Sequence, residues 1–467
     1  MDTRPLHYQS LLETSRALRA GETSSRAVTE VLLARISDLD GRFKSYIQVT
    51  REHALAQADA ADTALAQGRS RGPLHGVPIA VKDLCCTTFA PTMAGMPVND
   101  GFMSDHNATV VDRLETAGAV ILGKLSMTEG AYTSHHPSIP TPLNPLNPDY
   151  WVGSSSTGSG TATSAGFCYA SLGSDTGGSI RFPCATCGLT GLKPTWGRVS
   201  RHGVFDLAPS LDHVGPMARS AADCAAVLQA IAGYDPRDPT SLDAPVPDYM
   251  ASLSDGVRDI RIGIDPAYAL HGVDAPVKAA MEAAIDTFER LGARIVDVTM
   301  PPYEDLVAAW IMMCSVETAH VHTDTYPARA GEYGPDLVQL IEEGLATRGV
   351  DVARGHILRL EFSQALEAML AGVDVMLCPT MPTGTPSLAQ METYGEEPEV
   401  LNAILRYTAP FDFSGSPTLT LPNGVSDDGM PTSMQIVGPL LSEALLLRAG
   451  VAYQSATGWH CMHPDLE

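Results

Sequence analysis

What this chain can fold into is limited most strongly by residues 153–181, which read GSSSTGSGTATSAGFCYASLGSDTGGSIR. Serine and glycine dominate both ends of the stretch, whereas its middle, residues 167–172, is largely apolar. A flexible Gly/Ser linker would be polar throughout. The pattern therefore predicts a serine loop, a buried helix or strand, and a second serine loop within one core. Two such loops offer backbone N–H groups and hydroxyls, which suits the stabilisation of a developing oxyanion.

Composition narrows the class of protein further. The chain has 467 residues, 44% hydrophobic and 18% charged, and a formal net charge of −24. Length alone allows two or three domains, but we find no repeat and no long linker, so we expect one large domain. So acidic a surface repels phosphate backbones and anionic lipids, which argues against nucleic-acid and membrane partners. Without a signal-peptide pattern or an apolar run of about 18 residues, we expect a cytoplasmic protein.

The cysteine and histidine patterns favour structural roles. The chain has nine cysteines, most of them in apolar surroundings, which fits reduced and buried thiols. Cys184 and Cys187 have the spacing of a redox motif but follow Arg-Phe-Pro instead of opening a helix after a strand. The pair His135-His136 has no evident third ligand. We therefore expect no metal site, and these patterns do not indicate an organic cofactor.

Helical and strand patterns alternate along most of the chain. Residues 1–70 are predicted to be a helical segment packed on the core, and residues 71–467 one continuous α/β domain. A helix capped by Asn107 is expected to run to Gly118. Further strands and helices are predicted over residues 119–124, 260–264, 275–292, 294–298, 373–379, 418–421, 433–437 and 441–458. Strands separated by helices indicate an α/β fold with a central mixed β-sheet surrounded by helices.

Ser179 is the strongest candidate nucleophile. It follows Asp175-Thr176-Gly177-Gly178, where two glycines allow close approach of a substrate and successive N–H groups can form an anion-binding nest. A serine in this position still needs a base. The histidines have no distinguishing context, and the Gly-x-Ser-x-Gly elbow of other serine hydrolases is absent.

Lys82 is the alternative base. It closes the apolar segment LHGVPIAVKDL, in which alternation predicts a buried strand. Burial disfavours the charged form of a lysine, which makes a neutral amine available. A lysine that extends to solvent from a strand edge remains the other interpretation from spacing alone.

Three segments in this order, GVPIAVKD, GSSSTGSG and GSDTGGSIRFPCATCGLTGLKPT, resemble the amidase signature family. The resemblance extends to SLDHVGPMARS, DVMLCPT and SGSPTLTLPNG and covers most of the chain from about residue 70 to 460. It implies the family's fold and a Ser–cis-Ser–Lys triad in which Ser179 is acylated, Ser155 bridges and Lys82 is the base. It also implies an oxyanion hole at Thr176, Gly177, Gly178 and Ser179, and supporting roles for Ser156, Asp175 and Arg181.

The chain departs from the family pattern at one position. The family usually has Gly-Gly-Ser-Ser, whereas this chain has Gly153-Ser154-Ser155-Ser156. Either the cis bond joins Ser154 to Ser155, or the register shifts and Ser154 is the bridge. The spacing to Lys82 favours Ser155, since Ser156 then keeps its supporting role.

The resemblance implies an amidohydrolase that cleaves a carboxamide of a small molecule, or an aryl amide, carbamate or ester, through an acyl-enzyme. Tyr132 falls where family members line the acyl pocket, and Met127 and Trp310 are further pocket candidates. Ordinary core packing is the alternative for the methionine and the tryptophan. We expect a monomer or homodimer. The rival function is the glutamine-hydrolysing subunit of a tRNA-dependent amidotransferase, which the net charge and the lack of a polar glutamine-binding signature disfavour.

Overall fold

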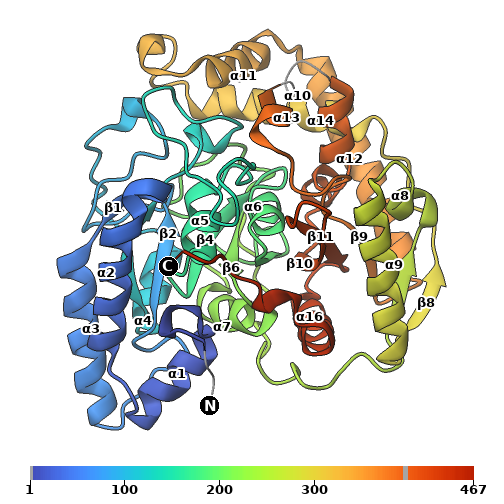
Figure 1. Cartoon of the computed structure of the whole chain (residues 1–467). Helices are drawn as coiled ribbons and strands as arrows, with labels where there is room; N and C mark the ends of the chain where they lie inside the picture. The colour runs from blue at the N-terminus through green and yellow to red at the C-terminus, as the bar shows by residue number, and fades with distance from the viewer. Residues whose placement is uncertain (1–3, 393–397, 467) are drawn as a thin grey trace.

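A single mixed β-sheet organises the molecule (Figure 1). The computed structural model describes residues 4–392 and 398–466. Within them the sheet has 11 strands in the order β1-β3-β2-β4-β6-β5-β10-β11-β9-β7-β8. The strands are β1 (Tyr46–Val49), β2 (Pro78–Lys82), β3 (Val120–Leu125), β4 (Ala170–Asp175), β5 (Thr190–Lys193), β6 (His213–Ala218), β7 (Arg261–Ile264), β8 (Arg294–Asp297), β9 (Val375–Pro379), β10 (Thr418–Val425) and β11 (Pro431–Val437).

Helices cover both faces of this sheet, which confirms the predicted α/β class. They are α1 (Leu11–Ala20), α2 (Ser25–Phe43), α3 (Arg51–Ala66), α4 (Thr109–Thr116), α5 (Thr157–Ser164), α6 (Arg181–Thr186), α7 (Ala221–Ile231), α8 (Pro266–Leu270), α9 (Ala275–Arg290), α10 (Leu306–Val321), α11 (Pro335–Ala346), α12 (Gly349–Leu370), α13 (Leu388–Glu392), α14 (Pro398–Leu405), α15 (Ala409–Phe413) and α16 (Glu443–Thr457). Helices α5 and α6 pack on one face, and α7, α9 and α16 on the other. In the described parts of the chain, no helix has the length and apolarity that a bilayer crossing needs.

The N-terminal segment contains one strand that the sequence did not predict. Besides α1, α2 and α3, it contributes β1, which pairs antiparallel with β3 at the edge of the sheet. Three of the four residues of β1 are exposed. The strand therefore has no buried face, and the alternation of apolar and polar residues that predicts a strand does not apply to it. The division of the chain at residue 70 stays a prediction, although this pairing joins the two parts in one sheet.

The predicted cap of helix α4 is wrong. The helix starts at Thr109 after Ala108, and the Asn107 side chain makes other bonds. Its amide oxygen accepts from the backbone N–H of Thr88 at 2.8 Å, and its amide nitrogen donates to Asp112 at 3.1 Å. A contact with a loop distant in sequence thus replaces the local cap.

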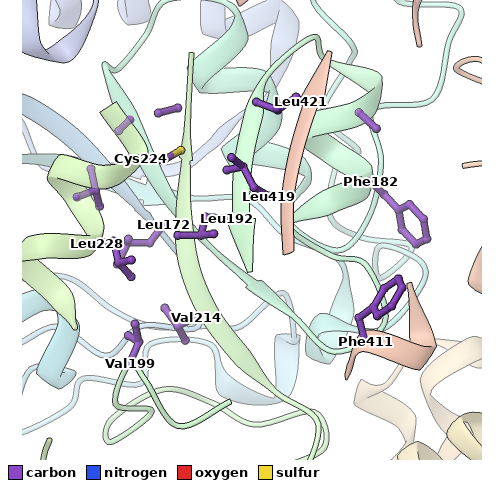
Figure 2. Packing of buried hydrophobic residues seen from close by; sticks show 14 of the residues in the cluster. Leu172, Phe182, Leu192, Val199, Val214, Cys224, Leu228, Phe411, Leu419 and Leu421 are labelled. Atoms are coloured by element: carbon purple, nitrogen blue, oxygen red, sulfur yellow. The ribbon is translucent and has the colours of Figure 1, made fainter. Parts of the chain in front are cut away.

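The strands at the middle of the sheet are buried on both faces. Every residue of β2, β4, β5 and β6 is buried, because helices cover the sheet from either side. Figure 2 shows Leu172 of β4 and Leu192 of β5 near Cys224 and Leu228 of α7. This packing fixes the ends of β2 and β4, from which the candidate site is built.

Helix α5 is made of small residues because it lies too close to its neighbours for larger ones. Its sequence is TGSGTATS, and every residue in it is buried. A Cβ at Gly158 would overlap the carbonyl oxygen of Ser45 and lie 2.6 Å from the backbone nitrogen of Ser126. The small residues of α5 therefore allow the helix to lie close to the backbone of neighbouring segments, which a flexible linker would not do.

We predict that Gly158→Ala lowers the free energy of unfolding by about 2 kcal/mol or more, because the added methyl group meets backbone atoms that cannot move aside. Gly41→Ala in α2 is the matched control: a Cβ there meets nothing within 4 Å. It should raise stability by up to about 1 kcal/mol through helix propensity. Urea unfolding of both variants measures the difference. Equal stability of the two variants would contradict the packing argument.

Candidate active site

Lys82 is the last residue of β2, and its side chain is fully buried. Because β2 lies between β3 and β4, the lysine enters the core, where its Nζ meets three serine hydroxyls. The distances from Nζ to Oγ are 2.7 Å for Ser155, 3.0 Å for Ser156 and 2.9 Å for Ser174. The structure thus brings Lys82, Ser155 and Ser156 together. It adds Ser174 of β4, which the sequence did not single out.

The charge state of the Lys82 amine follows from its surroundings. Burial lowers the pKa of Lys82 to about 7, although the charges of Asp175 and Asp212 act in the opposite direction. Lys124 on β3 is also fully buried, but its Nζ forms an ion pair with Asp83 at 2.9 Å. No carboxylate of the described residues forms such a pair with Lys82. A buried and unpaired amine favours the neutral state, which is the state that accepts a proton.

Proton positions around Lys82 follow from counting donors. The Ser156 hydroxyl donates to the carbonyl of Ser174 at 3.2 Å, so toward Lys82 it can only accept. A neutral amine has two N–H bonds and one lone pair. Ser155 and Ser174 are therefore the hydroxyls free to donate to that lone pair. This arrangement allows Ser155 to give its proton to Lys82.

The first serine loop, residues 153–156, lies directly against the helix that follows the second loop. Gly153 has a φ of +79°, and a Cβ there would lie 2.5 Å from the Cα of Pro183 in α6. Helix α6 begins two residues after Ser179. A cis peptide bond joins Ser154 to Ser155, and it is Ser155 that contacts Lys82.

The second serine loop is folded around the Asp175 carboxylate. This carboxylate accepts from the backbone N–H groups of Gly178 at 2.7 Å, Ile180 at 3.0 Å and Arg181 at 3.2 Å. The Arg181 guanidinium lies 2.8 Å from Asp175 and 2.6 Å from Asp412, and all three side chains are fully buried. Burial raises the pKa of Asp175, but the Arg181 charge outweighs it and holds the pKa below its usual range. Asp175 therefore stays ionised and organises the loop.

These bonds determine which N–H groups are free. Gly178 donates to Asp175, so its N–H is already occupied, although the resemblance assigns it to the oxyanion hole. In residues 4–392 and 398–466, no acceptor is bonded to the N–H of Gly177 or of Ser179. The Ser179 side chain is partly exposed. Within the same residues its hydroxyl makes no hydrogen bond, to Ser155 or to any other group, and is free to meet a substrate.

The three predicted pocket residues differ in exposure. Tyr132 is partly exposed, whereas Met127 is 1% and Trp310 7% exposed, which leaves little of either side chain for a substrate. The Trp310 indole N–H donates to the carbonyl oxygen of Thr176 at 2.8 Å. Trp310 thus contacts the predicted oxyanion-hole segment itself. The pocket assignment of all three stays a prediction.

Asp212 and Thr408, which also bond the segment before Ser179, gave no signal in the sequence. The Thr176 hydroxyl donates to Asp212 at 2.6 Å, and the Thr408 hydroxyl donates to the carbonyl of Gly177 at 2.7 Å. His135 Nε2 lies 3.1 Å from the hydroxyl of Thr157, next to the first serine loop. Of the residues that the sequence analysis did not single out, Ser174 alone had a usable signal, because it directly precedes Asp175 on β4, the strand beside β2.

Comparison with known proteins gives the family. The sequence profile of the Amidase family matches residues 27–447. A Mycobacterium tuberculosis protein named as amidase AmiD is 47% identical over 466 residues, which is 100% of this chain and 98% of that protein. A glutamyl-tRNA(Gln) amidotransferase subunit from Chloroflexus aurantiacus is 38% identical and is matched over 99% of both chains.

A solved structure agrees with the sequence relatives. The peptide amidase of Stenotrophomonas maltophilia superposes with a TM-score of 0.84 at 29% identity, over 99% of this chain and 100% of that one. With a family match over most of the chain and relatives similar from end to end, the resemblance seen in the sequence motifs is confirmed. The chain belongs to the Amidase family and is an amidase, a hydrolase that acts on carbon–nitrogen bonds.

Proposed function

We propose that this amidase works through a triad of Ser179, Ser155 and Lys82 and an acyl-enzyme intermediate. The observation that carries the proposal is the fully buried, unpaired Lys82 amine, 2.7 Å from the Ser155 hydroxyl. A neutral lysine is the base that such a relay needs. The free Ser179 hydroxyl, on the loop held by Asp175 and Arg181, supplies the nucleophile.

In the proposed acylation step, Ser179 Oγ attacks the carbonyl carbon of the substrate. Its proton passes to Ser155, whose own proton passes to Lys82. The carbonyl oxygen becomes an oxyanion, for which the N–H groups of Thr176, Gly177 and Ser179 are candidate donors, since none of them has an acceptor among the described residues. The carbon–nitrogen bond then breaks, and the relay returns the proton to the leaving amine. Water repeats the sequence on the acyl-enzyme and releases the carboxylic acid.

We propose a small-molecule carboxamide as the substrate, with aryl amides, carbamates and esters as further candidates. No cofactor enters this scheme, and a cytoplasmic monomer or homodimer remains our expectation. Tyr132, partly exposed, is the best candidate to contact the acyl group. Because Met127 and Trp310 are nearly covered, we give them less weight in substrate selection.

The alternative is the glutamine-hydrolysing subunit of a tRNA-dependent amidotransferase. It is favoured by the 38% identity to such a subunit over 99% of both chains. The net charge of −24 disfavours it, because an acidic surface repels tRNA. Copurification with partner subunits, or hydrolysis of glutamine alone, would support this alternative.

We predict that wild-type protein hydrolyses at least one member of a panel, and that Ser179→Ala abolishes this activity without changing the melting temperature. The panel holds a short aliphatic amide, an aryl anilide, an aryl carbamate, an amino-acid amide and glutamine. Ser154→Ala, at the serine that has no bond to Lys82, is the control and should keep most of the activity. Full activity of Ser179→Ala would exclude the proposed nucleophile.

We predict that kcat/KM rises with pH through about 7 and stays high in alkaline solution. The reason is that only the neutral amine of Lys82 accepts a proton, and burial lowers the pKa of Lys82 to about 7. The rate is therefore lost as the pH falls below that value. Lys82→Met should remove the activity, whereas His135→Gln should leave the midpoint of the profile in place. A midpoint that moves on replacing a histidine would contradict a lysine base.

A further inference from the structure

Trp310 of α10 contacts the loop before Ser179 in two ways. Its indole N–H donates to the carbonyl oxygen of Thr176 at 2.8 Å. Its ring lies on Gly177, where a Cβ would be 2.8 Å from the ring atom Cη2. The side chain is 7% exposed, so both contacts are shielded from water. Trp310 therefore holds the peptide between Thr176 and Gly177 from one side.

Because a peptide bond is planar, the bond from Trp310 to the Thr176 carbonyl also fixes the direction of the Gly177 N–H. In a trans peptide the C=O and the following N–H point in opposite directions. The next peptide shows the effect: Thr408 donates to the carbonyl of Gly177 at 2.7 Å, and the opposite N–H, of Gly178, reaches Asp175 at 2.7 Å. One peptide earlier, Trp310 holds the carbonyl, and the opposite N–H, of Gly177, has no acceptor in the described residues.

We propose that Trp310 is a positioning residue of the oxyanion hole: its indole N–H fixes the Thr176 carbonyl and thereby aims the Gly177 N–H at the oxyanion. The inference rests on the proposed function, since the hole has no ligand unless Ser179 forms a tetrahedral intermediate. Such donors act because they are held in place before the reaction. The hydroxyl of Thr176, bonded to Asp212 at 2.6 Å, restrains the same residue through its side chain.

This role needs an indole and not merely a large ring. Phenylalanine fills space on Gly177 but offers no N–H to the Thr176 carbonyl. The chain offers a matched control in Trp196. Its indole N–H is buried and has no hydrogen-bond partner in the part of the chain that the structure describes. Removing that N–H breaks no bond.

The test compares Trp310→Phe, Trp310 replaced by the isosteric 3-benzothienylalanine, and Trp196→Phe. For each we would measure kcat and KM on the substrate found with the panel, and the melting temperature. We would also measure the affinity of a trifluoromethyl ketone, which forms a tetrahedral adduct with a serine nucleophile. Both Trp310 variants should lose about 10- to 100-fold in kcat, below the loss from deleting an oxyanion donor outright. The ketone affinity should fall by a similar factor, with KM nearly unchanged and Trp196→Phe behaving as wild type.

Three outcomes would overturn the inference. They are unchanged kcat and ketone affinity in both Trp310 variants, a rise in KM alone, which would make Trp310 a substrate wall, or an equal loss in Trp196→Phe. Ser179→Ala, measured in parallel, separates this failure from that of the proposed function. If Ser179→Ala keeps activity, the triad is wrong. If Ser179→Ala is inactive while the Trp310 variants are fully active, only the role of Trp310 is wrong.

Discussion

The structure of the site depends on one constraint, a lysine amine buried without a counter-ion among the described residues. Lys82 is as deeply buried as Lys124, yet Lys124 has Asp83 while Lys82 has three hydroxyls. Hydroxyls satisfy the hydrogen bonds of an amine but do not stabilise its positive charge as a carboxylate does. The surroundings of Lys82 therefore favour a base over a cation. Helices cover both faces of β2, and the resulting burial of Lys82 favours its neutral form.

Unlike Lys82, the buried charges beside the second serine loop are paired with one another. Asp175, Arg181 and Asp412 form an ion-paired cluster with no exposed surface. The Asp175 oxygens accept hydrogen bonds from three backbone N–H groups and from the Arg181 guanidinium. The chain from Gly178 to Arg181 is therefore wrapped around one carboxylate. Removing one partner of such a cluster leaves an uncompensated buried charge, which is strongly destabilising. The loop that carries Ser179 is therefore held rigidly, as a preorganised site requires.

Glycine permits the close approach of neighbouring segments around the site. At Gly153 and Gly158, and again at Gly177, a Cβ would run into the backbone or the indole of a neighbouring segment. Without a Cβ at these positions, the backbones can approach closely, and serine hydroxyls and backbone N–H groups of different segments come near one another. The Ser/Gly-rich composition is thus a packing requirement of the site.

The order of residues was enough to derive the fold class and most strands after residue 100, because apolar periodicity is a local property that the fold preserves. The contact of Lys82 with the first serine loop was expected from the motifs that resemble the amidase signature family, whereas the part of Ser179 in a triad stays a proposal. Residue order was not enough for β1, whose residues are mostly exposed, or for the start of α4, where Asn107 bonds a loop distant in sequence. Packing of the whole chain settled that Ser174 contacts Lys82, that Gly178 is already bonded, and that Trp310 reaches Thr176. These contacts join residues that different elements bring together, and no local pattern records which N–H meets which acceptor once the chain has packed.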